Sequence, residues 1–182
     1  MDIYLVRHGE AAASWGQEPD PGLSELGRQQ AAKAAEFLYQ RIGDDTRLIS
    51  SPLARALETA APLAALTGKT VRQEDVFREI PSPVPLAERQ DWLKKFMRQQ
   101  WDGQGEALLQ WRSASLKRLL ELDSPLIVFT HFLVINAVVG QVLQRPETLC
   151  FLPGNGSITQ LRHSNNKLEL LALGDEIETL VN

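Results

Sequence analysis

The feature that most constrains the fold is a repeated alternation of short apolar runs with longer segments of helical spacing. Runs typical of strands occupy residues 2–6, 46–49, 70–73, 125–130, 157–162 and 167–172. Segments typical of helices occupy about residues 24–41, 53–66, 86–101, 105–121 and 132–143. Strands that alternate with helices predict an α/β fold with a mostly parallel central sheet flanked by helices on both faces.

The length of 182 residues is typical of one domain, and no internal repeat or low-complexity linker divides the chain. We therefore expect a single domain over residues 1–182. Asn165-Asn166, between the last two expected strands, is typical of the tight turn of a hairpin. Apolar residues of the later helical segments follow helical spacing and are expected in the core: Leu86, Leu93, Phe96, Met97, Leu108, Trp111, Leu116 and Leu119.

Basic side chains follow three of the expected strands. Arg7 and His8 end the N-terminal apolar run, Arg55 lies shortly after Leu48-Ile49-Ser50-Ser51-Pro52, and His131 follows the run at 126–130. Ligands of open α/β sheets bind beyond the carboxyl ends of the strands. Neutral imidazole can attack phosphorus, and guanidinium groups supply paired donors to phosphoryl oxygens. The pattern indicates phosphate chemistry, although a strand-end histidine with a structural arginine remains an alternative on spacing alone.

Four blocks in order resemble the histidine phosphatase superfamily, also called phosphoglycerate mutase-like, branch 1. Arg7-His8-Gly9-Glu10 matches its first motif, and residues 23–31 match its Leu-Thr-x-x-Gly-x-x-Gln-Ala segment. Residues 50–60 match its Ser-Ser-Pro-Leu-x-Arg-Ala-x-x-Thr-Ala segment, and His131 stands at its second histidine. Asn155-Gly156-Ser157-Ile158 resembles, more weakly, the segment that leads into a late strand near the pocket.

The resemblance implies a role for each matching residue. His8 is the expected phosphorylated nucleophile, Arg7 and Arg55 are expected phosphate ligands, and His131 is expected to contact the phosphoryl group. Glu79 is similar to the family's acid, which protonates the leaving oxygen and then activates water. Four other acids remain alternatives for that role: Glu10, Glu74, Asp75 and Glu106.

Two positions depart from the family pattern. Phe132-Leu133 follows His131 where many members have glycine, and this change could narrow the pocket. Ser14 and Trp15 stand where many members have an asparagine some residues after the first motif. Neither departure removes a charged catalytic group, but both bear on the identity of the substrate.

Residues 81–112 occupy the place where family members carry variable insertions over the cleft, so we expect a small helical cap there. The segment begins with the stiff sequence Pro81-Ser82-Pro83-Val84-Pro85. Its basic residues, Arg89, Lys94, Lys95 and Arg98, could attract an acidic substrate. Because Glu88 and Asp91 interrupt the run, we interpret these four cations as a solvated helix face.

Composition excludes several classes of function. The net charge is −4 and there is no basic stripe, which argues against a nucleic-acid partner. No stretch resembles a secretory signal or a membrane span, and the single cysteine fits a reducing compartment, so we expect a cytoplasmic protein. Three histidines without His-x-x-x-His spacing argue against a metal site.

These observations predict a cofactor-independent phosphomonoester hydrolase that acts through a phosphohistidine at His8. Its expected partner is a small phosphorylated metabolite or a phosphohistidine protein. Two alternatives remain: a phosphoglycerate mutase-type phosphotransferase, and a catalytically weak module that binds phosphorylated ligands or phosphohistidine proteins.

Overall fold

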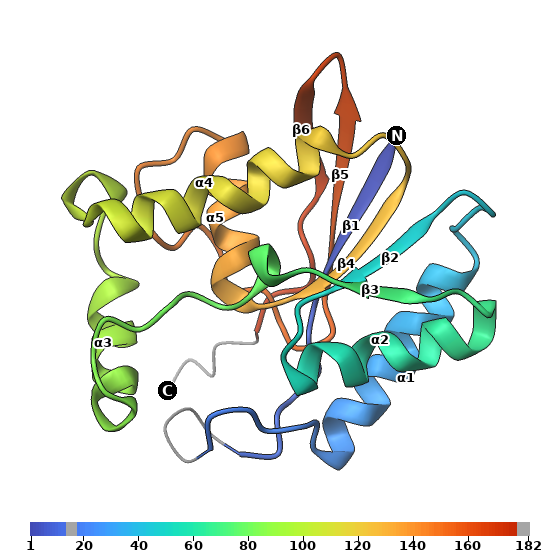
Figure 1. The fold of residues 1–182 in the computed structure, drawn as a ribbon, viewed down its shortest axis with the longest axis horizontal. Helices are drawn as coiled ribbons and strands as arrows, with labels where there is room; N and C mark the ends of the chain where they lie inside the picture. Colours follow the sequence, from blue (N-terminus) through green and yellow to red (C-terminus); the bar gives the residue numbers. More distant parts are fainter. Residues whose placement is uncertain (14–17, 178–182) are drawn as a thin grey trace.

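The computed structural model describes residues 1–13 and 18–177 and shows one mixed sheet with helices on both faces (Figure 1). Its strands are β1 (Asp2–Arg7), β2 (Arg47–Ser50), β3 (Val71–Gln73), β4 (Leu126–Thr130), β5 (Ile158–Ser164) and β6 (Lys167–Ala172). They lie in the order β3-β2-β4-β1-β5-β6. The first four strands in that order are parallel, and β5 pairs antiparallel with β1 and β6. The predicted fold class is confirmed.

The two faces of the sheet are covered by different pairs of helices. Helices α1 (Glu25–Tyr39) and α2 (Ala54–Thr67) pack on one face, and α4 (Glu106–Glu121) and α5 (Phe132–Val142) pack on the other. Successive side chains of a strand point to opposite faces. Tyr4 and Val6 of β1 therefore pack toward α1 and α2, whereas Ile3 and Leu5 pack toward α5. Because helices cover both faces of the sheet, the side chains of the central strands are buried on both sides, and their sequences are continuous apolar runs.

The first two helices begin at different kinds of residue. Ser24 caps α1, because its side chain accepts a hydrogen bond from the Gly27 backbone N–H. Helix α2 begins at Ala54, so Pro52 lies just before the helix. Arg55 is accordingly the second residue of α2, at the end that faces the carboxyl edge of the sheet.

The expected continuous helix over residues 86–101 is wrong. The structure has a 3₁₀ turn at Leu86–Glu88, helix α3 (Arg89–Phe96) and a second 3₁₀ turn at Trp101–Gly103. Residues 146–148 occupy the backbone groups that would form the next helical hydrogen bonds. The Thr148 hydroxyl donates to the Phe96 carbonyl at 2.6 Å, and the Trp101 N–H donates to the Pro146 carbonyl. Leu86, expected in the core, is 42% exposed.

Helix α3 is held against the molecule by its own apolar cluster. Leu93 and Phe96 pack with Ile80, Trp101 and Phe132, the first residue of α5. This cluster lies apart from the two clusters that sandwich the sheet, at the left of the view in Figure 1. It fixes the position of α3 relative to the carboxyl end of β4.

The predicted hairpin of β5 and β6 is confirmed. Asn165 and Asn166 have φ values of 50° and 58°, which asparagine tolerates better than most residues. In the part of the chain that the structure describes, no helix combines the length and the apolar character needed to cross a membrane.

Candidate active site

Side chains that follow three strands converge beyond the carboxyl edge of the sheet. The register of the neighbouring strands β1 and β4 pairs Arg7 with Thr130, and the His8 N–H donates to the Thr130 carbonyl at 3.0 Å. His8 and His131 therefore leave adjacent strands at one level, with ring centres 5.2 Å apart. Arg55 of α2 completes the group, with its Nε 3.2 Å from His8 Nε2.

The hydrogen bonds of His8 define its tautomer. Its Nδ1 lies 2.7 Å from the Gly9 carbonyl, which can only accept, so Nδ1 carries the proton. Its Nε2 receives the Arg55 Nε–H and must therefore hold a lone pair. Burial, reinforced by Arg55 and Arg7, lowers the pKa of His8 to about 3. His8 is a neutral imidazole whose free electron pair faces a guanidinium group.

Two glycines allow the loop after β1 to approach α1 closely. A Cβ on Gly9 would overlap the carbonyl oxygen of Gly27, and a Cβ on Gly27 would overlap the carbonyl oxygen of Glu10. The Gly9 N–H also donates to the Thr59 hydroxyl at 3.0 Å. Gly27 and Thr59, which belong to two other motifs, thus position Gly9, the residue that follows His8.

Arg7 is a buried cation with few partners. Its Nη1 donates to the Pro153 carbonyl at 2.7 Å, while its buried Nε has no hydrogen-bond partner among the described residues. The guanidinium carbon lies 5.0 Å from the ring centre of Phe132, within cation–π range. Burial lowers the pKa of Arg7 to about 10. Phe132, which replaces the glycine of many family members, therefore packs against a predicted phosphate ligand.

Asp20, in the segment between β1 and α1, contacts both Arg55 and the start of its helix. Asp20 Oδ1 accepts the Ala54 N–H at the start of α2 and lies 3.8 Å from Arg55 Nη1. Burial lowers the pKa of Arg55, and the charges of Glu79 and Asp20 oppose that shift. Asp20 is not recognisable as a site residue from the sequence, because it lies far from Arg55 along the chain.

His131 is fully buried, and one of its ring nitrogens is already engaged. Its Nε2 lies 2.7 Å from the Ser51 hydroxyl, whereas its buried Nδ1 has no partner among the described residues. Burial lowers the pKa of His131 well below its usual value, and His8, Arg55 and Arg7 add to the shift. Ser51 was also missed as a site residue, although it lies within the Ser-Ser-Pro block.

Glu79 lies at the opposite side of the group. Its Oε1 accepts the Ile80 N–H at 2.9 Å, and its Oε2 accepts the Leu133 N–H of the first turn of α5 at 3.3 Å. Burial raises the pKa of Glu79, although these two hydrogen bonds and the charges of Arg55 and Arg89 oppose the shift. A buried carboxyl of raised pKa can hold a proton at higher pH than an exposed one.

The four alternative acids do not share this position. They make other contacts: Glu74 with Arg118, Asp75 with Arg78, Glu10 with Ser24 and Glu106 with Gln110. Of the five candidates, Glu79 is the one that lines the main cavity of the site. The geometry therefore favours Glu79 over the other four.

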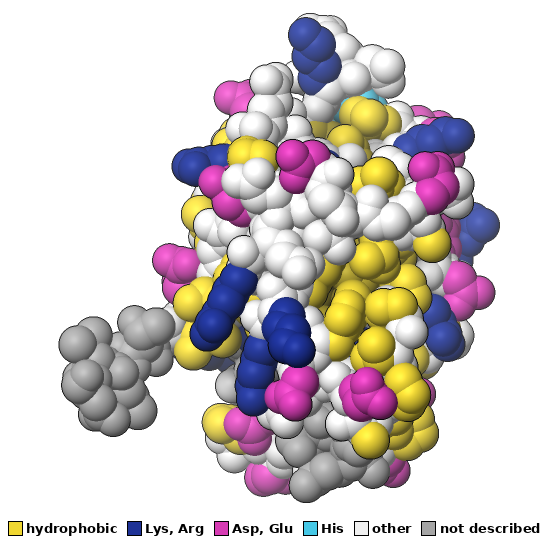
Figure 2. All heavy atoms as spheres, turned by 90° about the vertical axis from the view of Figure 1, so that its left-hand side faces the viewer, with side chains coloured by type: hydrophobic (Ala, Val, Ile, Leu, Met, Phe, Trp, Pro, Cys, Tyr) yellow, Lys and Arg dark blue, Asp and Glu magenta, His cyan; other side chains and the backbone are white. Residues whose placement is uncertain are grey.

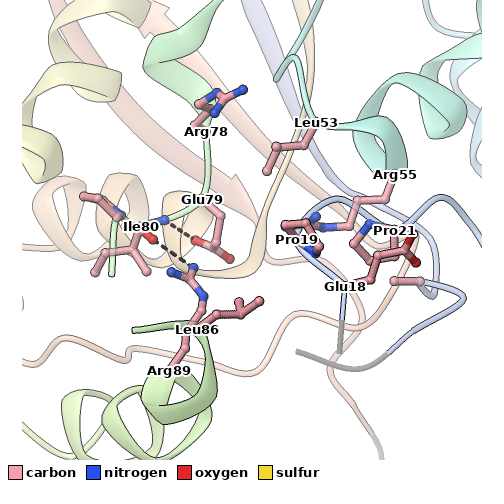
Figure 3. A pocket seen from close by; sticks show the side chains of 12 residues that line it. Glu18, Pro19, Pro21, Leu53, Arg55, Arg78, Glu79, Ile80, Leu86 and Arg89 are labelled. Atoms are coloured by element: carbon pink, nitrogen blue, oxygen red, sulfur yellow. Dashed lines mark hydrogen bonds between the residues drawn. The ribbon is translucent and has the colours of Figure 1, made fainter. Parts of the chain in front are cut away.

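The cavity beside these residues has a volume of about 230 Å³ (Figure 3). Arg55 and Pro21 lie on one side, while Glu79, Ile80 and Arg89 lie on the other. The full lining comprises Ala11, Glu18, Pro19, Pro21, Leu53, Arg55, Arg78, Glu79, Ile80, Pro81, Leu86 and Arg89. The apolar surface of Leu86, which was expected in the core, forms part of this wall.

The interpretation of Arg89 as part of a solvated helix face is wrong. Its side chain is half-buried, lines the cavity and donates from Nη2 to the Ile80 carbonyl at 2.9 Å. Lys94, Lys95 and Arg98 are exposed, as expected. Helical spacing turns Arg89, at the first position of α3, toward the cavity, whereas Lys94 and Lys95 point away from it. Lys and Arg side chains gather beside an apolar area on the side of the molecule that carries α3 (Figure 2).

The late segment predicted near the pocket does lie there. The Asn155 side chain donates to the His8 carbonyl at 3.2 Å, and the Gly156 N–H donates to the Arg7 carbonyl at 3.1 Å. Ser14 and Trp15, the other departure from the family pattern, lie outside the described residues.

The assembled group is suited to binding an anion and attacking it. The group comprises the neutral His8 imidazole, a second neutral imidazole from His131, two buried guanidinium groups and a carboxyl of raised pKa. No cluster of three or more His, Cys, Asp or Glu side chains that could hold a metal ion occurs within residues 1–13 and 18–177.

The comparisons with known proteins agree on one family. The histidine phosphatase superfamily (branch 1) matches residues 3–176. The glucosyl-3-phosphoglycerate phosphatase of Mycobacterium tuberculosis is 40% identical over 81 residues, which cover 42% of this chain and 35% of that protein. Human mitochondrial serine/threonine-protein phosphatase PGAM5 is 29% identical over 178 residues, or 95% of this chain and 62% of that protein. The chain thus spans only part of these curated relatives.

Solved structures with the same fold cover nearly the whole chain. A mycobacterial glucosyl-3-phosphoglycerate phosphatase in complex with VO3 has a TM-score of 0.74 and 28% identity, covering 94% of this chain and 98% of that one. A mutant phosphoserine phosphatase from Entamoeba histolytica in complex with phosphoserine has a TM-score of 0.76 and 25% identity. It covers 94% of this chain and 95% of that one.

Proposed function

This chain belongs to the histidine phosphatase superfamily (branch 1), and we propose that it is a phosphomonoester hydrolase that acts through a phosphohistidine at His8, without a metal or cofactor. The observation that carries the proposal is the neutral His8 imidazole, whose Nε2 lone pair faces Arg55. An imidazole nucleophile must be unprotonated, and a pKa of about 3 keeps it so at neutral pH.

In the first half-reaction, His8 Nε2 attacks phosphorus and the bond from phosphorus to the ester oxygen breaks. Arg55 and Arg7 hold the equatorial phosphoryl oxygens, whose negative charge compensates the two buried guanidinium groups. His131 Nδ1 is the ring nitrogen left to donate to the phosphoryl group, since Ser51 occupies its Nε2. Protonated Glu79 gives its proton to the departing oxygen.

In the second half-reaction, the Glu79 carboxylate accepts a proton from water as the water oxygen attacks the phosphohistidine. The bond between Nε2 and phosphorus breaks, inorganic phosphate forms and His8 regains its lone pair. Glu79 ends the cycle protonated, so one carboxyl serves both steps. Its burial and its position across the cavity from Arg55 support this assignment.

We infer that the substrate is a small phosphorylated metabolite. The cavity of about 230 Å³ is small for a ligand site, and the names of the relatives include phosphatases of glucosyl-3-phosphoglycerate and phosphoserine. In this proposal residues 1–182 form a single histidine phosphatase domain. Residues 81–112, with Arg89 at the cavity wall, act as its cap.

Phosphate release from para-nitrophenyl phosphate tests the proposal. We expect the native protein to be active in the presence of a chelator and His8→Ala to be inactive. His163→Ala, which removes the histidine of β5, is the matched control and should keep native activity. Loss of activity in chelator, or full activity of His8→Ala, would contradict the proposed mechanism.

A further inference from the structure

Arg89 is a cavity cation that forms no ion pair with the described residues, although the charge of Glu79 acts on it. Within the described part of the chain, no carboxylate oxygen lies within 4.0 Å of its guanidinium, whereas Arg78 pairs with Asp75 at 3.0 Å and Arg55 with Asp20 at 3.8 Å. Among the described residues, Arg89 makes one hydrogen bond, from its Nη2 to the Ile80 carbonyl. Since a guanidinium group has five N–H donors, most of the donors of Arg89 remain for a ligand.

The position of Arg89 is fixed relative to Glu79 through one residue. Ile80 donates its N–H to Glu79 Oε1 at 2.9 Å and accepts at its carbonyl from Arg89 Nη2 at 2.9 Å. Figure 3 shows Arg89 reaching from α3 toward Ile80 and Glu79 on one side of the cavity. If Glu79 protonates the leaving oxygen, the alcohol that carries this oxygen lies beside Arg89.

Apart from Glu79, the side chains of the wall near Arg89 are mostly apolar (Figure 3). Leu86, Ile80 and Pro81, which line the same cavity, are apolar. A half-buried cation in such surroundings favours an anionic ligand, because the interaction is weakened less by water than on an open surface. The planar fork of guanidinium matches a carboxylate with two parallel hydrogen bonds.

We propose that Arg89 is a specificity-determining residue that binds a carboxylate on the alcohol part of the substrate. The preferred substrates would then be phosphomonoesters of small hydroxy acids, over esters of uncharged alcohols. This inference rests on the proposed function, because it uses Glu79 to locate the leaving oxygen.

The test compares 3-phosphoglycerate with glycerol 3-phosphate, which share a three-carbon skeleton and differ in a carboxylate at the far end. We expect the native protein to prefer 3-phosphoglycerate in kcat/KM by roughly tenfold or more, the effect of a charge-assisted hydrogen bond. Arg89→Met should abolish most of this preference, mainly through KM, and should lower kcat/KM for 3-phosphoglycerate more than for glycerol 3-phosphate or para-nitrophenyl phosphate.

Lys95→Met is the matched control, since it removes one positive charge from an exposed position of the same helix. It should keep the native preference. Arg89→Lys keeps the charge but not the planar fork, and should keep only part of the preference. A structural role of Arg89 alone predicts a different result, in which Arg89→Met lowers the turnover of all three substrates equally.

Calorimetric binding to His8→Ala separates this inference from the mechanism, because it needs no turnover. Tighter binding of 3-phosphoglycerate than of glycerol 3-phosphate, lost in His8→Ala/Arg89→Met, supports the subsite even if the hydrolase proposal fails. Equal affinities in His8→Ala, or equal kcat/KM values in an active native protein, would overturn the role of Arg89 and leave the hydrolase proposal standing.

Discussion

At the scale of single residues, the chemistry depends on which nitrogen of His8 carries the proton. The Gly9 carbonyl fixes the proton on Nδ1, and Arg55 donates to Nε2. A bound phosphoryl group would offer Arg55 oxygen acceptors in place of that nitrogen, which would free the lone pair for attack. In the proposed mechanism, substrate binding thus draws Arg55 away from His8 Nε2 and makes this nitrogen available as the nucleophile.

The role of Glu79 leads to a prediction about leaving groups. Glu79→Gln cannot donate a proton, so hydrolysis of an alkyl phosphate should slow by roughly 100-fold or more, the usual contribution of a general acid. Para-nitrophenyl phosphate, whose leaving group needs little protonation, should lose far less activity. Steady-state kinetics on both substrates measure the difference.

The pH profile of the same variant gives a second readout. Because burial raises the pKa of Glu79, the native enzyme should keep its acid function above the usual carboxyl range and lose it as the pH rises through that pKa. This alkaline decline should be absent in Glu79→Gln. Glu106→Gln, an exposed change on α4, is the control. Equal losses on both substrates would place the acid elsewhere.

At the scale of elements, the start of α5 gathers three functions in consecutive residues. His131 lies in the site, Phe132 packs against Arg7, and the Leu133 N–H donates to Glu79. Phe132 also belongs to the apolar cluster that holds α3. This first turn therefore connects the phosphate ligands to the wall that carries Arg89.

Replacement of the Phe132 ring should weaken the binding of phosphate. A cation–π contact contributes about 0.5–2 kcal/mol, so Phe132→Leu should raise the inhibition constant of inorganic phosphate by roughly twofold to thirtyfold. Phe132→Tyr keeps the ring and should stay near the native value. Inhibition of para-nitrophenyl phosphate hydrolysis measures the constant.

A second aromatic contact provides the control for this prediction. Phe37 lies 3.6 Å from the Arg41 guanidinium on the surface of α1, away from the site. Phe37→Leu should leave the inhibition constant unchanged. If Phe132→Leu binds phosphate as tightly as the native protein, the ring does not position Arg7.

Most elements could be predicted from the sequence, and the failure at residues 86–101 has a specific cause. Apolar spacing predicts that Leu93 and Phe96 face the protein, and both are buried. It cannot predict that residues 146–148 take the hydrogen bonds which would extend the helix. Helical spacing also could not predict the role of Arg89, because its hydrogen bond to the Ile80 carbonyl forms only in the folded chain.

At the scale of the whole molecule, the predicted site residues meet because the sheet order brings their strands together. His8, Arg55 and His131 come from parts of the chain that are far apart, yet β1, β4 and β2 are neighbours. The motifs made these three residues predictable. Asp20 acts through a contact that exists only in the folded chain, so no pattern pointed to it. Ser51 lies within a recognised motif, but its contact with His131 is visible only in the structure.

Burial of two neutral histidines should make the protein sensitive to acid. The pKa of His8 is lowered to about 3 and that of His131 is lowered too, whereas histidine in an unfolded chain titrates near 6.5. The unfolded state then binds more protons, so the free energy of unfolding falls as the pH drops below about 6.5. For His8 the decline ends near its folded pKa of about 3.

Urea unfolding at pH values of about 7.5 and 5.5 measures this sensitivity. His8 should contribute about 1.4 kcal/mol to the loss of stability over that interval, and His131 should add a loss in the same direction. His8→Gln should therefore show a smaller loss than the native protein, and His163→Gln controls for removal of a histidine outside the site. An identical pH dependence in the native protein and His8→Gln would contradict the account.

Detection of the covalent intermediate tests the central claim most directly. Native protein and Glu79→Gln would be mixed with para-nitrophenyl phosphate, quenched in alkali, which preserves phosphohistidine, and digested for mass spectrometry. The account predicts one added phosphoryl group on His8, at higher occupancy in Glu79→Gln because its hydrolysis step is slower. Turnover with no phosphoryl group on His8 in either protein, or with the group on another residue, would contradict it.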